Sequence, residues 1–578
     1  MFRTCLTLLL ASASCVLPAR AADRVAEQLF PKTMVLYAEI PNPSALISAI
    51  FDHPLRAKLE ALEPYKQAVR SDAYRAFLTG RKFVEIQLGM EWREALETVL
   101  AKGVYVGVDG ATQGVAVLIR AKDAPSLELF RSKLLEISKM GKNPDQIKEG
   151  EYRGISAYEI NKTKLAIVDD WLLITNKPET GKAFLDRFID GPPIGESLAD
   201  NETFQQARQT QPRKSTGWGF ADLKTLRDAG IAKKLYGGKS DNPVIELLAG
   251  GILSTLQHTP FATLRLTATH TEFGFELSVP HSVDWITEER EYYFGLDGTG
   301  RGPALPAVDN TLFTLSTYRD MSEMWLRAGD LFDERINDGF AEADANLTTF
   351  FSGKDFGEDI LGSLTPQIGL IASKQNFDSV LPVPTIKLPQ FALVLELKEP
   401  ETMTRELRRT FQSMIGFFNV IGAMAGRPQL EMDIDKLDSG AELITSTYIP
   451  EDGEAKSTSA PLLFNFSPSV GFAKERFVVA STDRLARELV ESGTVRTDQN
   501  PLNTAAQLKA DVLKDILSDN REQLISQNML EEGHSRDEAE NAINLLLELV
   551  GYFEDASVKL DTQHDALSLQ IKVQIKSE

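Results

Sequence analysis

Apolar runs follow one another in the same order in the two halves of this chain. The clearest pair is 115–119 and 391–395, each apolar throughout and followed by charged residues. Runs of this length with turn residues at their ends are typical of buried strands. A proline follows each run, Pro125 in one half and Pro400 in the other. Because proline is tolerated in the first turn of a helix, we expect a strand and then a helix at both places.

Four further blocks repeat in register. Their types are a strand running into a capped helix, a helix end followed by a strand, a tight hairpin, and a closing hairpin. The pairs are 34–40 with 312–318, 92–108 with 356–372, 165–174 with 470–480, and 262–277 with 556–571. In the closing hairpins, apolar and polar residues alternate, as in 264–266 and 558–560. Such alternation predicts strands with one buried face.

This repetition predicts an α+β fold made of two tandem similar domains. Each domain would have a largely antiparallel sheet with helices packed on one face. We place the domains at residues 22–285 and 306–578. Between them, 286–305 begins with charged residues and continues with glycines and a proline, which is typical of a linker. We expect proteases to cut there first.

The N-terminal residues 1–21 have the pattern of a signal peptide. Arg3 precedes a short apolar stretch, and Ala19-Arg20-Ala21 fits a cleavage site. The sequence therefore predicts cleavage after Ala21 and a periplasmic or extracellular location in a bacterium. Both cysteines, Cys5 and Cys15, lie in this segment. The mature chain would then have no disulfide and no cysteine chemistry.

Net charge and hydropathy exclude some classes of partner and of membrane attachment. The formal net charge is -21, which disfavours a nucleic-acid partner because phosphate backbones are negative. The longest later apolar segment, 414–425, is shorter than the roughly 20 residues of a membrane span, so we predict no transmembrane segment after signal cleavage. We expect a buried core helix there; the alternative is the wall of an apolar ligand site or a membrane-touching face.

Candidate chemistry is sparse. If 261–279 forms a hairpin, His258 and His281 lie together at its base with Asp284 nearby, and two imidazoles with a carboxylate can bind zinc. The matching positions of the second half hold Tyr552 and Ile575, which favours isolated surface histidines over a metal site. The glycines at 298–302 lack the helix that a dinucleotide loop requires. We expect no cofactor, and the sequence favours a protein without catalytic activity.

The segment Ser197–Phe204, which follows the first tight hairpin and its helix, adds a resemblance. Together with the order of elements, it resembles a family of exported bacterial proteins known only as a domain of unknown function. The resemblance implies the duplicated α+β fold and transfers no catalytic residues. We expect an exported, non-enzymatic binding or scaffold protein of the bacterial cell envelope, with a protein or another envelope component as partner. The alternatives are a carrier of an apolar ligand or lipid, and a secreted hydrolase using carboxylates or a histidine site.

Overall fold

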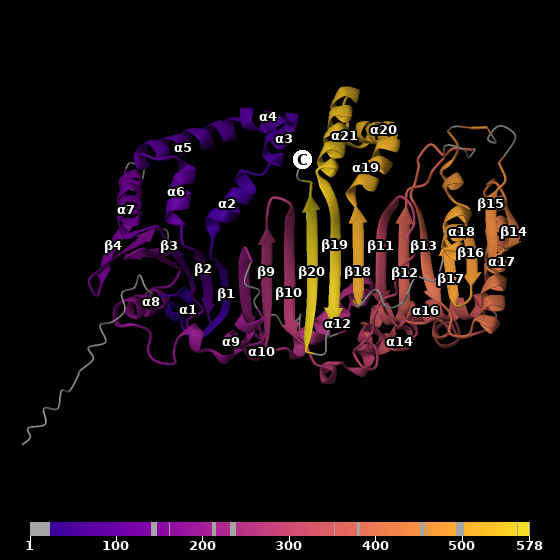
Figure 1. Cartoon of the computed structure of the whole chain (residues 1–578), viewed down its shortest axis with the longest axis horizontal. Helices are drawn as coiled ribbons and strands as arrows, with labels where there is room; N and C mark the ends of the chain where they lie inside the picture. Colours follow the sequence, from indigo (N-terminus) through magenta and orange to yellow (C-terminus); the bar gives the residue numbers. More distant parts are fainter. Residues whose placement is uncertain are drawn as a thin grey trace, which may run out of the picture. The chain divides into compact units, whose positions relative to one another are not determined.

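The computed structural model (Figure 1) confirms an α+β fold with a large antiparallel sheet content. It describes residues 24–139, 147–160, 162–210, 215–231, 239–351, 353–377, 382–450, 456–457, 459–492, 502–562 and 565–576. The expected signal peptide lies outside these residues. The chain divides into two compact units: unit 1 is Met1–Ser48 with Gln67–Asp222, and unit 2 is Ala49–Lys66 with Leu223–Glu578.

The sheet of unit 1 has the strand order β8-β1-β2-β3-β7-β6-β5-β4, antiparallel throughout. Its strands are β1 (Met34–Ile40), β2 (Val104–Asp109), β3 (Val115–Arg120), β4 (Ile147–Tyr152), β5 (Ile155–Ile160), β6 (Thr163–Val168), β7 (Trp171–Thr175) and β8 (Gly217–Asp222).

One face of this sheet is closed by an aromatic core. The ring of Phe30 lies edge-on to Tyr37 and to Phe184, with centroids 5.3 and 5.0 Å apart. Phe184 comes from helix α8 (Pro178–Asp190) and Phe204 from α9 (Glu202–Gln209), and both are buried. The segment Ser197–Phe204 determines where α9 begins, because its Ser197 and Asp200 form a capping box and Asn201 caps α9.

The sheet of unit 2 is larger and has the order β9-β10-β20-β19-β18-β11-β12-β13-β17-β16-β15-β14, again antiparallel. Its strands are β9 (Phe261–Ala268), β10 (Glu272–Pro280), β11 (Thr311–Tyr318), β12 (Gln367–Ser373), β13 (Gln390–Glu396), β14 (Leu430–Lys436), β15 (Glu442–Tyr448), β16 (Ser469–Ala473), β17 (Arg476–Ala480), β18 (Thr504–Lys509), β19 (Phe553–Thr562) and β20 (Ala566–Ile575).

Longer helices flank these strands. They are α2 (Pro43–Phe51), α3 (Leu55–Ala61), α4 (Glu63–Arg70), α5 (Asp72–Leu88), α6 (Trp92–Val99), α7 (Ala124–Lys139), α10 (Leu223–Asp228), α12 (Pro243–His258), α14 (Met321–Leu326), α16 (Glu334–Phe350), α17 (Pro400–Met424), α18 (Asp483–Glu491), α19 (Ala510–Asp519), α20 (Arg521–Glu532) and α21 (Arg536–Gly551). Shorter ones are α1 (Ala26–Leu29), α13 (Glu291–Phe294) and α15 (Ala328–Leu331). No helix in the described ranges is long and apolar enough to cross a membrane.

The strand order of unit 1 recurs within unit 2, where β11 to β18 pair as β1 to β8 do. The first strand of each set carries a register shift at the same place, between Met34 and Leu36 in β1 and between Thr311 and Phe313 in β11. The tight hairpins also agree, with left-handed backbone at Asp169 in one and Lys474 in the other. Strands form at every place where the repeated blocks predicted them.

The division of the chain differs from the expected one at 22–285 and 306–578. The hairpin β9–β10, expected to close the first domain, belongs to unit 2 and pairs with β20 through nine residue pairs, from Glu272↔Gln574 to Pro280↔Ala566. The physical reason is that β20 would otherwise be an unpaired edge, and edge strands offer a free row of hydrogen-bonding groups.

The stretch 286–305 is not an exposed linker, and this corrects the expectation. Tyr292, Tyr293 and Phe294 are fully buried in it. Its glycines serve close packing: a Cβ at Gly302 would lie 2.8 Å from the backbone nitrogen of Thr317 in β11. The segment is therefore part of the core of unit 2.

Candidate functional site: an open apolar sheet face

One unbroken apolar row crosses all twelve strands of the unit 2 sheet. Each member lies directly opposite the next in the strand register. From β9 to β14 the row is Leu266, Phe275, Ile571, Val558, Ala506, Leu315, Leu370, Leu393, Val479, Val470, Ile444 and Ile434. Because side chains alternate across a strand, all twelve point to the same face, which we call the apolar face.

Neighbouring rows widen this face. Two residues further along the strands lie Leu264, Leu277, Leu569 and Leu560, in register from β9 to β19. On the other side lie Ala268, Phe273, Val573, Ala556, Leu508, Phe313, Ala372 and Phe391, from β9 to β13. The apolar face is thus three residues deep over β9, β10, β20 and β19.

The opposite face of the same strands is polar. Arg265 and Glu276 form an ion pair there, and the row continues with Gln570 and Lys559. A sheet with one polar and one apolar face normally buries the apolar one.

The apolar face is only partly buried over this region. Leu264, Phe275, Ile571, Val558, Leu393 and Phe391 are between 36% and 51% exposed. On the other side of β12 and β17, Ile371 and Val478 are completely buried under α18. The alternation of apolar and polar residues was predicted correctly, and the apolar side is buried at Leu560 and Ala268. The prediction of burial is wrong for the middle of β9, β10, β20 and β19, where Leu264, Phe275 and Ile571 are exposed. Figure 1 shows α19, α20 and α21 beyond one end of these strands, and α12 and α14 near the other.

Helix α17 closes the apolar face only at its far edge. Its Phe411 and Ile415 pack against Val470, Phe472 and Phe477. The expected buried core helix at 414–425 is therefore only partly correct. Ile415 is buried, but further along Phe417, Val420, Ile421 and Met424 are exposed, because only one side of the helix reaches the sheet.

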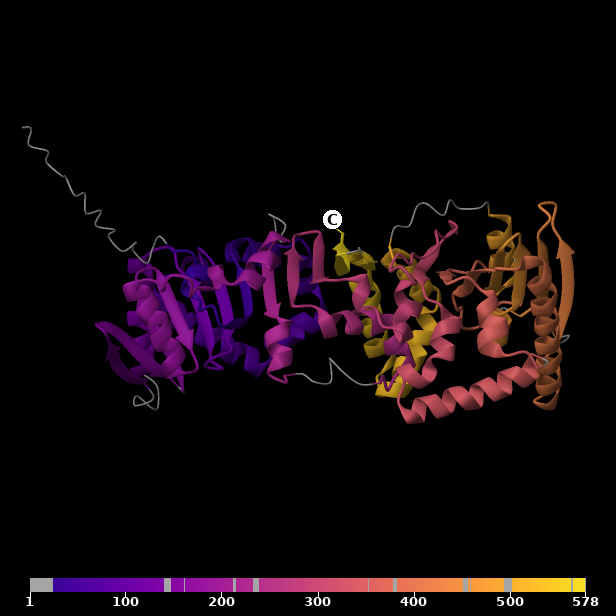
Figure 2. The same cartoon turned by 90° about the horizontal axis from the view of Figure 1, so that it is seen from below.

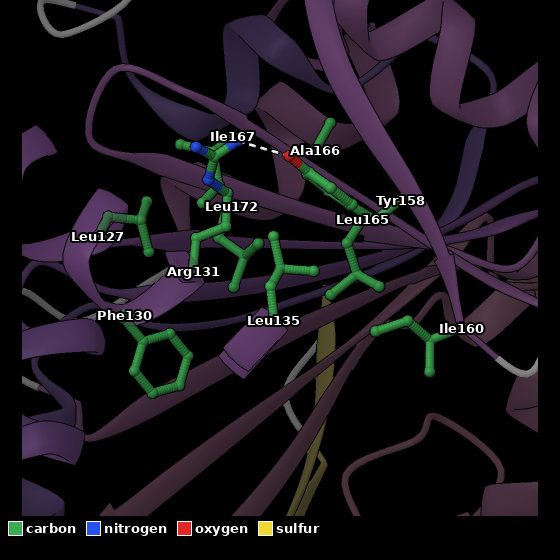
Figure 3. A pocket seen from close by; sticks show the side chains of 10 residues that line it. All are labelled: Leu127, Phe130, Arg131, Leu135, Tyr158, Ile160, Leu165, Ala166, Ile167 and Leu172. Carbon is green, nitrogen blue, oxygen red and sulfur yellow. Dashed lines mark hydrogen bonds between the residues drawn. The ribbon is translucent and has the colours of Figure 1, made fainter. Parts of the chain in front are cut away.

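Unit 1 has a helix in the equivalent place, and a small pocket lies beneath it. Helix α7 supplies Leu127, Phe130, Arg131 and Leu135, and strands β5 to β7 supply Tyr158, Ile160, Leu165, Ala166, Ile167 and Leu172 (Figure 3). Arg131 donates to the Tyr158 hydroxyl at 2.6 Å. The cavity measures about 50 Å³, which is room for a water molecule or two and too little for an organic ligand. In unit 2 the bulkier Phe472 and Phe477 stand where unit 1 has Ile167 and Leu172.

The residues of the candidate zinc site are not grouped as metal ligands. His258 is exposed at the end of α12 and stacks on Trp285, with ring centroids 6.2 Å apart. His281 is buried, with its Nδ1 3.1 Å from the hydroxyl of Thr255 and its ring against Phe294. Asp284 is exposed. Across the described ranges, no three His, Cys, Asp or Glu side chains are grouped to hold a metal. Burial also lowers the pKa of His281.

A buried ionic cluster, which the sequence analysis missed, lies between α12, α13 and β11. Arg290 donates to Glu246 at 3.0 Å, and the Tyr292 hydroxyl donates to the Glu246 carbonyl at 2.8 Å. Arg319 lies over the Tyr293 ring and donates to Asn503 at 2.8 Å.

Burial lowers the pKa of Arg319 and raises the pKa values of Tyr292 and Tyr293. Arg290 and Glu246 neutralise each other, and Arg319 is held by oxygen acceptors and a ring, so we assign the cluster to structure. The aromatic run 292–294 inside a supposed linker was the sequence signal for it.

Comparisons with known proteins add little. No protein-family model matches the chain, and a search of curated proteins gives no match. Among solved structures, three crystal forms of TP0453 are similar over 45% of this chain. Form IV has 12% identity, a TM-score of 0.25 and 82% coverage of that chain; form III has 11%, 0.24 and 80%; form I has 11%, 0.24 and 79%. Scores this low carry no argument about fold or function.

Proposed function

We propose that the protein is a non-enzymatic binding protein of the bacterial cell envelope that holds an apolar ligand, the acyl chain of a lipid, on the apolar face of unit 2. The observation that supports this is the row from Leu266 to Leu393, which is apolar on eight consecutive strands and exposed at four of them, through Phe275, Ile571, Val558 and Leu393. Scattered apolar residues are normal on protein surfaces, but a contiguous patch of this size marks an interaction site.

The chemistry of the face favours an acyl chain. Its strands are paired on both sides except at the edges β9 and β14, so a peptide cannot add as a further strand between them. The three rows present aliphatic and phenyl groups, with no charged side chain among them to orient a polar ligand. At strand spacings of about 4.8 Å, the eight strands from β9 to β13 span about 34 Å. Such a surface recognises length and hydrophobicity, which are the properties of an acyl chain.

The expected signal peptide supports placing this activity in the envelope. The recurrent strand order supports a duplication of the chain, in which the β9–β10 hairpin of the first copy pairs with the last strand of the second. Carrying lipids would need no catalytic group. The scaffold alternative would use the same face for a protein partner.

The test is binding of fluorescently labelled palmitate to the full chain. Val558→Glu places a charge in the middle of the apolar face. Lys559→Glu introduces the same residue one position along β19, on the polar face. Because an unpaired charge is costly to bury, we expect Val558→Glu to weaken binding by more than about tenfold and Lys559→Glu to leave it unchanged. Equal binding by both variants, or no saturable binding by the original chain, would refute the proposal. Palmitate-insensitive self-association that Val558→Glu abolishes would assign the face to a protein contact instead.

A further inference from the structure

The C-terminal half of α17 carries a second apolar surface, distinct from the apolar face of the sheet. Phe417, Val420, Ile421 and Met424 are between 47% and 86% exposed. They follow the spacing i, i+3, i+4, i+7, which places them on one side of a helix. We call these four residues the α17 stripe. It lies opposite the side that faces the sheet, where Ile415 is buried and the Asn419 amide exchanges two hydrogen bonds with the backbone of Leu430.

The position of α17 leaves the stripe accessible. The helix packs against β14, the last strand in the sheet order, and Figure 2 shows it running alongside that edge. The Asn419 amide donates to the Leu430 carbonyl and accepts from the Leu430 N–H, which ties the stripe-bearing turns to β14. The stripe therefore lies on a helical segment that is anchored to the sheet edge.

The stretch of sequence that carries the stripe is basic, unlike the chain as a whole. Residues 407–430 contain Arg408, Arg409 and Arg427 and no acidic residue, whereas the whole chain has 83 acidic residues in 578 and a net charge of -21. At the overall frequency, a stretch of this length would hold three or four acids. Arg408 pairs with Glu442 at 2.7 Å, while Arg409 and Arg427 are exposed. Seen along the axis, Arg409 flanks the stripe, since successive residues turn by about 100°.

We propose that the α17 stripe docks on a lipid surface that carries anionic headgroups. A helix with an exposed apolar stripe and arginines beside it lies in the interface of a bilayer, with the apolar side chains among the acyl chains and the cations at the headgroups. Each arginine near an anionic surface strengthens binding by about fivefold. The net negative charge of the chain does not prevent this, because at physiological salt, charges more than about 8 Å away are largely screened. The proposal does not rest on the ligand assigned to the apolar face.

The experiment compares cosedimentation of the full chain with vesicles of phosphatidylcholine alone and of phosphatidylcholine mixed with phosphatidylglycerol. Ile421→Glu interrupts the stripe. Leu248→Glu, on α12, is the matched control, because Leu248 is an exposed apolar residue of comparable exposure on another helix. Arg427→Glu tests the charge. All variants carry the same N-terminal segment, so differences between them report on the substituted site.

We expect the phosphatidylglycerol vesicles to bind the protein at least about fivefold more tightly than phosphatidylcholine alone. Ile421→Glu and Arg427→Glu should each lose about fivefold or more, while Leu248→Glu binds as the original chain does. Hydrogen exchange on the original chain should show new protection over 414–426 when vesicles are added. Unchanged binding by Ile421→Glu, equal binding to both vesicles, or protection elsewhere only would overturn the proposal. Concentration-dependent dimerisation without vesicles that Ile421→Glu abolishes would also overturn it, by assigning the stripe to a second copy.

Discussion

The buried pair of Glu246 and Arg290 allows a quantitative test of whether 286–305 belongs to the core of unit 2. Arg290→Met removes the guanidinium but keeps a long apolar side chain. The Glu246 side chain is 1% exposed and that of Arg290 9%, with Nε and Oε1 3.0 Å apart. Removing one partner of a buried pair costs about 3–5 kcal/mol because the other charge stays buried without compensation. The Tyr292 hydroxyl lies 3.3 Å from Glu246 Oε1 and offsets part of this, so we expect about 3 kcal/mol.

The matched control is Arg536→Met, the same substitution in an exposed pair of unit 2. Arg536 lies 2.8 Å from Glu540, but its side chain is 56% exposed, and exposed pairs contribute about 0–1 kcal/mol. Native-state hydrogen exchange of α12, β10 and β20 measures the loss within unit 2 alone. A difference between the two variants below about 1 kcal/mol would show that 286–305 is a solvated linker, and the reasoning would fail. Adding Glu246→Leu to Arg290→Met should restore much of the loss, since an apolar pair replaces the stranded carboxylate.

Two further predictions concern the buried imidazole of His281 and the close packing at Gly302. His281 has a pKa below its usual 6.5 because it is buried, so the unfolded chain takes up its proton first and wild-type stability falls as pH drops below about 6.5; His281→Gln should flatten this loss in melting curves between about pH 5 and 8, and identical pH slopes would contradict the assignment. Gly302→Ala should destabilise unit 2 by about 1–3 kcal/mol, because its Cβ would meet the Thr317 backbone. Gly416→Ala, with open space around it in helix α17, should stabilise by about 0.5–1 kcal/mol; chemical denaturation of both variants decides, and equal effects would count against the close packing of 286–305.

Strands could be predicted from this sequence because their signals are local. The apolar runs at 115–119 and 391–395 and the turns at Asp169 and Lys474 each act within a few residues. Pairing between distant strands has no such signal. No pattern in the sequence of β10 indicates that its edge pairs with β20. Because that pairing places β9 and β10 in unit 2, the division of the chain could not be predicted.

The sequence also does not show which apolar surfaces are buried in the folded protein. Alternation in 264–266 shows which side chains share a face, but not whether another element covers that face. The same limit applies to α17, where an apolar segment of twelve residues was expected to be buried as a whole. The glycines at 298–302 were interpreted as part of a linker, although Gly300 and Gly302 allow a close approach to β11. For His258 and His281, the hairpin predicted a shared position at its base, but the side chains have different surroundings: His258 stacks on Trp285 and His281 on Phe294.

The net charge and the open apolar surfaces have to be understood together. An apolar face left open on a monomer favours self-association, because burying apolar area against a second copy releases about 25 cal/mol per Å². A net charge of -21 opposes this, since like-charged molecules repel as they approach. At physiological salt that repulsion acts only within about 8 Å, where it opposes a second copy of the chain but not a neutral acyl chain. Residues 407–430 contain no acidic residue, and there the proposed anionic bilayer surface would meet the exposed Arg409 and Arg427. The charge distribution thus separates the two apolar surfaces by the kind of partner that each can accept.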